Sequence, residues 1–283
     1  MKALLLYSHT SGHKNFSRQL AKVKTSLSSA FERLDIVCTF SSAEAARYEK
    51  EAGERYDVLL IAGGDGTFNN AVNNLMNVRK TPILGYLNFG TIGDVGRNFG
   101  IYGGLARALA IIKEGHVEAF DVGEANGVYF AYTCAIGRYS DIAYATPRQE
   151  KRRHGRLAYY VVATRQAFQP KLIHYEVEVD GKKIEGESAF VMVLNGVNMG
   201  GFRVNGNGKI NDGKMELFIA DKGPFNGLTH YVSHRKLTVI SSSKFLIKTS
   251  EKGPWCLDGE KGPEGQILII NHPKALRIFS KPF

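Results

Sequence analysis

The strongest constraint on the fold is an apolar run that ends directly in a glycine-rich turn. Residues 58–62 read VLLIA, and Gly63-Gly64-Asp65-Gly66-Thr67 follows them without a spacer. A continuous apolar run is typical of a β-strand that is covered on both faces, and residues 68–76 predict a helix after the turn. In a parallel α/β sheet, ligands bind where strands end and the next helices begin.

The alternation of strand and helix extends over the first part of the chain. Apolar runs predict strands at residues 3–7, 35–40 and 83–87, and apolar residues at helical spacing predict helices at residues 16–34, 43–54 and 103–113. Strands separated by helices predict an α/β domain with a doubly wound parallel sheet over residues 1–122.

The rest of the chain has the pattern strand, turn, strand. Residues 176–184 predict a hairpin around an Asp180-Gly181 turn. Further strands are expected at residues 189–194, 215–220, 244–249 and 266–270, and helices at residues 155–168 and 225–237. The pattern predicts a mainly antiparallel β-sandwich domain over residues 123–271. Residues 272–283 are expected to pack back on the first domain.

The composition narrows the class of protein and of partner. Hydrophobic residues make up 43% of the chain, and its cysteines form no C-x-x-C pair. No segment approaches the roughly 20 apolar residues of a membrane span, so a cytoplasmic protein is expected. The net charge of +10 favours an anionic partner, such as a nucleotide or an anionic membrane surface. No recognition motif supports binding to nucleic acid.

The glycine turn carries the first chemical prediction. Glycines let backbone N–H groups approach phosphate oxygens closely, and the N-terminus of the following helix favours an anion. Asp65 could hold a metal, orient a ribose or position a nucleophile. The turn is neither a P-loop nor a Rossmann fingerprint, because the residues that define those motifs are absent. A phosphate site is predicted here, with a plain β–α turn as the alternative.

The same turn resembles the signature shared by diacylglycerol kinases, sphingosine kinases, NAD kinases and phosphofructokinases. Four more segments are similar to lipid kinase motifs in particular, and they occur in the family's order: Ser8-His9-Thr10-Ser11-Gly12, Gly90-Thr91-Ile92-Gly93-Asp94-Val95-Gly96-Arg97, Lys209-Ile210-Asn211-Asp212-Gly213 and Asp258-Gly259-Glu260. The whole set most resembles the soluble bacterial diacylglycerol kinases, whose first domain has an NAD kinase-like fold.

The resemblance implies a role for each matching residue. Glu260 would be the general base, with Asp94 and Asp65 as further catalytic carboxylates. Thr91 would offer its hydroxyl to a phosphate. The residues implied to bind the nucleotide are Ser8, His9, Thr10, Ser11, Gly12, Ser41, Gly63, Gly64, Asp65, Gly66, Thr67, Phe68, Asn69, Asn70 and Thr91.

A Mg²⁺ site is implied at Lys209, Asp212 and Lys214. Asp212 would provide a carboxylate, and the two lysines would provide backbone carbonyls; oxygen ligands of this kind suit Mg²⁺. A loop-to-strand turn without a metal stays open as the alternative.

The implied activity is that of an ATP- and Mg²⁺-dependent lipid kinase in phospholipid biosynthesis, which phosphorylates diacylglycerol to phosphatidic acid. Asn70 and Gly93 depart from the family pattern, which has Glu and Asn at these positions, and Ser8-His9 replaces Asn-Pro. An NAD kinase-like enzyme and a catalytically weakened nucleotide-binding homologue therefore stay open.

The partner implied by the resemblance is a lipid at an anionic membrane surface. The basic run at residues 148–156 would anchor the enzyme there peripherally, because each cation near such a surface contributes about 1 kcal/mol. Free strand edges in the β-rich domain are compatible with a homodimer.

Overall fold

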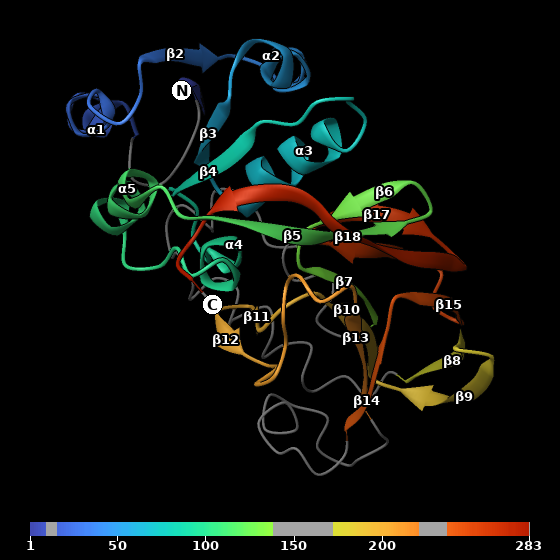
Figure 1. Ribbon diagram of the computed structural model, residues 1–283. Coiled ribbons are helices and arrows are strands. Elements are labelled where there is room, and N and C mark those ends of the chain that lie inside the picture. Colours follow the sequence, from blue (N-terminus) through green and yellow to red (C-terminus); the bar gives the residue numbers. More distant parts are fainter. Residues whose placement is uncertain (10–15, 138–171, 221–236, 283) are drawn as a thin grey trace. The chain divides into compact units, whose positions relative to one another are not determined.

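The computed structural model describes residues 1–9, 16–137, 172–220 and 237–282 (Figure 1). The described residues form two compact units, one made of Met1–Phe120 with Lys274–Phe283 and the other of Asp121–Pro273. The helix expected at residues 155–168 lies outside the described residues, as do the basic run, Thr10, Ser11 and Gly12. The helix expected at residues 225–237 also lies outside them except for Leu237, which begins a strand and does not end a helix.

The first unit contains a parallel sheet with helices on both faces. Its strands are β1 (Lys2–Ser8), β2 (Arg33–Thr39), β3 (Val58–Gly63) and β4 (Ile83–Asn88), in the order β2-β1-β3-β4. The last residues of β18 (Ile267–Phe279) pair in parallel with β4. The helices are α1 (Phe16–Leu27), α2 (Ser42–Arg55), α3 (Asp65–Leu75), α4 (Asp94–Asn98) and α5 (Leu105–Glu114). The pairs α1–α5 and α2–α3 each make contact (Figure 1), and the predicted parallel α/β fold is confirmed.

The burial of β3 explains its continuous apolar sequence. All its residues are buried, because β1 pairs on one side of it, β4 on the other, and α2 and α3 both contact it. The helix after it starts at Asp65 and not at residue 68, with Gly64 as its N-cap. The helix expected at residues 16–34 ends at Leu27, because β2 starts at Arg33 and pairs with β1 along its whole length.

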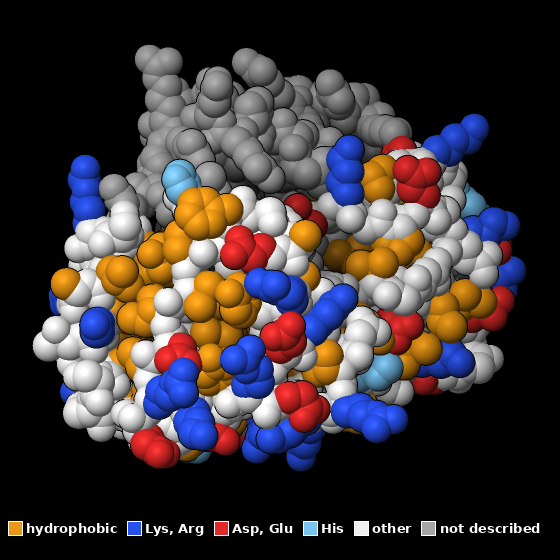
Figure 2. Space-filling model, turned by 90° about the horizontal axis from the view of Figure 1, so that it is seen from above, with side chains coloured by type: hydrophobic (Ala, Val, Ile, Leu, Met, Phe, Trp, Pro, Cys, Tyr) orange, Lys and Arg blue, Asp and Glu red, His pale blue; other side chains and the backbone are white. Residues whose placement is uncertain are grey.

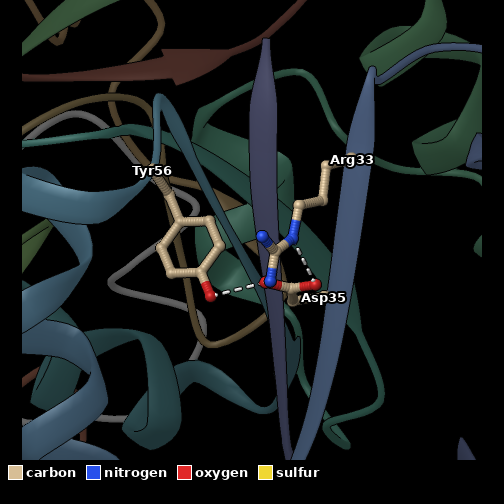
Figure 3. A network of polar contacts seen from close by, with 3 residues as sticks. All are labelled: Arg33, Asp35 and Tyr56. Atoms are coloured by element: carbon tan, nitrogen blue, oxygen red, sulfur yellow. Dashed lines mark hydrogen bonds and ion pairs between the residues drawn. The ribbon is translucent and has the colours of Figure 1, made fainter.

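A polar network holds the edge strand β2 (Figure 3). The Arg33 Nε–H donates to Asp35 Oδ1 over 2.9 Å, and the Tyr56 hydroxyl donates to Asp35 Oδ2 over 2.7 Å. The Arg33 guanidinium and then the Tyr56 hydroxyl hold the pKa of the Asp35 carboxyl below its usual range. Since Tyr56 is the C-cap residue of α2, the network ties this edge strand to the end of the helix.

The second unit is a sandwich of antiparallel strands. One sheet has the order β14-β13-β10-β7-β16-β17, and the other includes β18-β15-β8-β9, with β5 pairing β18 and β6. The strands are β5 (Val117–Ala125), β6 (Val128–Phe130), β7 (Thr133–Gly137), β8 (Ile173–Val179), β9 (Lys182–Ser188), β10 (Phe190–Leu194), β11 (Asn198–Met199), β12 (Phe202–Arg203), β13 (Met215–Ala220), β14 (Leu237–Ser242), β15 (Lys244–Thr249), β16 (Pro254–Leu257) and β17 (Glu260–Glu264). One core cluster joins residues of both sheets, including Trp255 and Phe245, and the predicted sandwich is confirmed.

The hairpin predicted at residues 176–184 is present as β8 and β9, joined at Asp180 and Gly181, which both have positive φ. Strand β18 extends far beyond the expected residues 266–270. It continues through Pro273 and the positive-φ residue Lys274. These residues lie between the part of β18 that pairs with β15 and the part that pairs with β4, where the missing proline N–H disturbs neither of these pairings.

Candidate functional site

Two glycine turns lie against each other at the carboxyl ends of β3 and β4. The first glycine turn comprises residues 63–67 and the second comprises residues 90–97. A Cβ atom on Gly90 would lie 2.7 Å from the Cα of Gly64, and one on Gly64 would lie 3.2 Å from the Cα of Gly90. The Phe89 N–H also donates to the Gly63 carbonyl over 2.8 Å. The close approach of the two backbones excludes a side chain at position 90 and leaves only tight room for a Cβ atom at position 64.

The Asp65 carboxylate joins the two turns. It accepts hydrogen bonds from the backbone N–H groups of Gly93 at 3.0 Å, Asp94 at 3.2 Å and Val95 at 3.1 Å. These are the unsatisfied donors at the start of α4, so Asp65 caps that helix from another element. Burial raises the pKa of the Asp65 carboxyl, and the three N–H groups and the Tyr86 hydroxyl oppose this rise.

Gly93 is explained by its surroundings. It has φ +73°, a conformation that favours glycine, and a Cβ atom there would collide with the side-chain nitrogen of Asn88. The Asn88 Oδ1 in turn accepts a hydrogen bond from the Gly90 N–H over 2.8 Å. Asn88 therefore occupies the space that a side chain at position 93 would need. Gly93 leads directly into Asp94, which is 2% exposed and begins α4.

The N-terminus of α3 differs from those of α2 and α4. Ser41 caps α2 through its hydroxyl oxygen, which accepts the Glu44 N–H over 3.1 Å, and Asp65 caps α4. At α3 the N-cap is Gly64, which has no side chain to do so. Within the described part of the chain, the first turn of α3 has no side-chain cap. Such N–H groups at the carboxyl end of a strand make a binding place for phosphate.

The remaining predicted nucleotide residues divide between the sheet edge and the core. Ser8 ends β1, and the exposed His9 follows it. Asn70 is an exposed residue of α3, whereas Asn69 is 5% exposed. Five further residues are half-buried, namely Gly64, Asp65, Gly66, Thr67 and Thr91.

The Phe68 side chain belongs to the core of the first unit. It is fully buried and contacts the rings of Tyr86, Phe99 and Phe120. Only the backbone of Phe68 remains for contact with a nucleotide, and its N–H already donates to the Gly64 carbonyl. The core contacts of Phe68 therefore anchor the start of α3, which the glycine turn begins.

A second aspartate clamp holds the predicted base in the other unit. The buried Asp258 carboxylate accepts the backbone N–H groups of Ala131, Tyr132 and Thr133 at 2.6, 3.0 and 2.9 Å. Asp258 and Gly259 have φ of 51° and 90°, as in a type I′ hairpin turn. Glu260 follows the turn, opposite Leu257, and is exposed.

The predicted metal loop is held by a residue that the sequence patterns did not single out. The fully buried Asp121 accepts the Gly213 N–H through Oδ2 over 2.7 Å, and its own N–H donates to the Ile210 carbonyl over 2.7 Å. The Asn271 amide also donates to Asp121 Oδ2 over 3.0 Å. The burial of Asp121 depends on contacts with distant segments, so no local sequence pattern identifies it.

The residues of this loop fit a weakly held cation. Lys209, Asp212 and Lys214 are exposed, and Asp212 Oδ1 accepts the Lys214 N–H over 3.1 Å. Burial raises the pKa of Glu216, and the negative charge of Asp212 raises it further. A cation would relieve this repulsion. In the described ranges, no group of three or more His, Cys, Asp or Glu residues could hold a metal. Water molecules would therefore have to provide the remaining ligands of a cation at this loop, and Mg²⁺ usually keeps several bound waters.

Among the described residues, no helix has the length and apolar character needed to span a membrane.

The comparisons with known proteins cover nearly the whole chain. The family model of the diacylglycerol kinase catalytic domain matches residues 2–125, and that of the YegS C-terminal NAD kinase beta sandwich-like domain matches residues 139–280. The diacylglycerol kinase of Staphylococcus carnosus (strain TM300) is 28% identical over 99% of this chain and 95% of its own length. That of Staphylococcus aureus (strain MRSA252) is 29% identical over 99% and 92%. A crystal structure of a diacylglycerol kinase from Bacillus anthracis str. Sterne superposes with a TM-score of 0.86, at 25% identity over 99% of this chain and 97% of that one.

Proposed function

Because the chain belongs to the diacylglycerol kinase family and is a lipid kinase, we propose that it transfers the γ-phosphate of ATP to the hydroxyl of diacylglycerol. The products are phosphatidic acid and ADP. The first unit serves as the nucleotide-binding domain and the second as the lipid domain.

The observation that carries this proposal is the N-terminus of α3, which starts in the first glycine turn and has no side-chain cap from the described residues. Its N–H groups provide the donors that the ATP phosphates need, while Asp65 keeps the second turn in place. Arg97 on α4 adds a buried Nε that has no hydrogen-bond partner. A buried guanidinium N–H without a partner is suited to an anionic ligand.

Asp65 acts as a positioning residue for Asp94. Its carboxylate binds the N–H groups of residues 93–95, so the conformation of the Asp94 backbone depends on the charge of Asp65. The Asp94 carboxylate would act through a Mg²⁺ ion and water bound with the phosphates, because a negative charge alone would repel them. Phosphoryl transfer depends mainly on positioning and electrostatics of this kind.

Glu260 serves as the general base. Its carboxylate accepts the proton of the lipid hydroxyl while the hydroxyl oxygen forms a bond to the γ-phosphorus, and the bond from that phosphorus to the leaving ADP oxygen breaks. The exposed position of Glu260 leaves its carboxylate open to a substrate, and the Asp258 clamp fixes the turn that carries it.

Mg²⁺ is assigned to the loop of Lys209, Asp212 and Lys214. Bound Mg²⁺ supplies positive charge that neutralises carboxylate and phosphate oxygens. The chain's own contribution is the Asp121 anchor, which fixes the loop through Gly213 and Ile210.

Because the substrate is a lipid, the proposal includes peripheral contact of the protein with an anionic membrane. The net charge of +10 supports it. On the face shown in Figure 2, Lys and Arg side chains alternate with Asp and Glu. The attraction is therefore assigned to the overall charge and not to a single basic patch on that face, and it weakens with salt. A homodimer is proposed from the strand edges of the second unit.

A lipid panel with radiolabelled ATP tests the proposed function. Mixed micelles that contain diacylglycerol, sphingosine or monoacylglycerol are incubated with the protein and Mg²⁺, with NAD as a soluble acceptor in a parallel reaction. Labelled phosphatidic acid as the main product is expected. Labelled NADP would identify an NAD kinase-like enzyme, and ATP binding without transfer to any acceptor would identify a nucleotide-binding homologue.

A further inference from the structure

Two aromatic side chains lie beside the proposed phosphate site on the same edge of the sheet. Ser8 and Thr39 are register partners at the ends of β1 and β2, so His9 and Phe40 are the next residues of two neighbouring parallel strands. The His9 N–H continues the pairing by donating to the Thr39 carbonyl over 2.9 Å. Both residues therefore lie at the carboxyl edge, where the first glycine turn also lies.

The Phe40 ring is exposed although its backbone is fixed. The side chain is 74% exposed, more than any other large hydrophobic side chain in the described ranges. Its backbone N–H donates to Glu44 Oε2 over 2.8 Å, and the Glu44 N–H binds Ser41. The capped start of α2 thus holds the ring at the strand end. Single exposed hydrophobic residues are common, so exposure alone assigns no role.

A second ring distinguishes Phe40 from such residues. The His9 ring centroid lies 5.3 Å from that of Phe40, with an angle of 46° between the planes. The rings are tilted against each other, so a planar group that stacks on the exposed Phe40 ring would meet the His9 ring at an angle. Aromatic groups attract one another in stacked and in inclined arrangements, so the two rings together can hold a third planar group.

The spacing along the edge matches a ligand that already has its phosphates at α3. In the order β2-β1-β3, two strand spacings separate the end of β3 from the end of β2, which is about 10 Å. A nucleoside triphosphate extends from charged phosphates to a flat, neutral base. The edge offers N–H donors at one end and aromatic rings at the other.

We propose that His9 and Phe40 form a stacking platform for the base of the nucleotide donor and thereby contribute to donor recognition. The inference rests on the proposed function for the identity of the donor. Stacking requires a π-face only, so the platform does not select one purine over another. It favours purines over pyrimidines because the purine ring system is larger. Its contribution lies in nucleotide affinity and leaves the chemical step unchanged.

Calorimetric binding of a non-hydrolysable ATP analogue and of inorganic tripolyphosphate tests the platform. Base–aromatic stacking supports an effect of roughly tenfold in affinity. Phe40→Leu is expected to lower the affinity for the ATP analogue by about that factor and to leave the affinity for tripolyphosphate unchanged. Phe40→Trp is expected to retain the affinity for the analogue. His9→Leu is expected to weaken the analogue in the same direction. Tyr102→Leu is the matched control, because Tyr102 is another exposed aromatic residue of the first unit, at 60%.

The outcomes separate this inference from the proposed function. Unchanged analogue affinity in Phe40→Leu overturns the platform, as does an equal loss for the analogue and tripolyphosphate. A loss of binding to anionic vesicles with unchanged analogue affinity would instead make Phe40 a membrane contact and also overturns it. A wild-type protein that binds the analogue through Phe40 but phosphorylates no lipid supports the platform and contradicts the kinase proposal.

Discussion

The substitution Glu49→Gln is expected to change how stability depends on pH. Glu49 lies on α2, is 3% exposed, and accepts a hydrogen bond from the Asn74 side chain of α3 over 2.7 Å. Burial raises the pKa of this carboxyl to about 6, and the Asn74 hydrogen bond opposes the rise. At neutral pH the folded protein therefore holds a buried negative charge between two helices.

The magnitude follows from the difference between the two states. The ordinary pKa of the carboxyl is 4.5, and its rise to about 6 in the folded protein corresponds to about 2 kcal/mol. Because the folded-state pKa of this acid is raised, the unfolded chain releases the proton first. The wild-type free energy of unfolding therefore falls by about 2 kcal/mol as the pH rises from about 4 to about 7, and glutamine removes this loss.

Urea unfolding followed by far-ultraviolet circular dichroism measures the effect. All helices of the described residues lie in the first unit, as does Glu49, whereas Trp255 fluorescence would report on the second unit. The free energy of unfolding of Glu49→Gln, relative to that of wild type, should rise by about 2 kcal/mol between pH 4 and pH 7. The exposed Glu54 on the same helix provides the control Glu54→Gln. A difference between Glu49→Gln and wild type that stays constant over this pH range would refute the reasoning.

Three further substitutions test the clamps and the turn. Asp65→Asn should lower kcat at least about tenfold and destabilise the first unit by about 1–3 kcal/mol. The control Asp57→Asn, at the opposite end of β3, should change kcat little. Equal kcat values for these two variants would show that Asp65 has no role in the site. Asp258→Asn should destabilise the second unit by about 1–3 kcal/mol, measured by Trp255 fluorescence, and an unchanged urea midpoint would contradict the clamp. Gly93→Ala should lower the free energy of unfolding by at least about 1–2 kcal/mol, because residue 93 has a φ of +73°. An unchanged melting temperature would contradict this prediction and show that the turn adopts another conformation.

Local sequence patterns were sufficient for the strand, turn and helix around residues 58–76. A continuous apolar run and the glycines directly after it are local features, so they can be recognised without the rest of the fold, although the start of α3 at Asp65 was not predicted. The helix α4 was missed because it is short and its cap is distant. Its N–H groups bind Asp65, about thirty residues earlier in the chain.

The contacts that position the candidate site residues could not be predicted in the same way. Asp258 binds N–H groups of residues 131–133, and Asp121 binds Gly213 and Asn271. These pairs depend on which strands become neighbours, and a buried carboxylate has no periodic pattern of its own. Glu260 and Asp212 were predicted through their motifs, while the contacts that hold their turns became visible only in the folded chain.

The most direct test of the central claim compares phosphate transfer to diacylglycerol by wild type, Glu260→Gln and Glu264→Gln. Glu260 and Glu264 are exposed glutamates at the two ends of β17, so the two substitutions are matched in charge and strand. The account predicts labelled phosphatidic acid from wild type and Glu264→Gln, and a fall in kcat of about 100-fold or more in Glu260→Gln, with unchanged binding of an ATP analogue. Equal kcat values for the two variants, or no labelled phosphatidic acid from wild type, would contradict it.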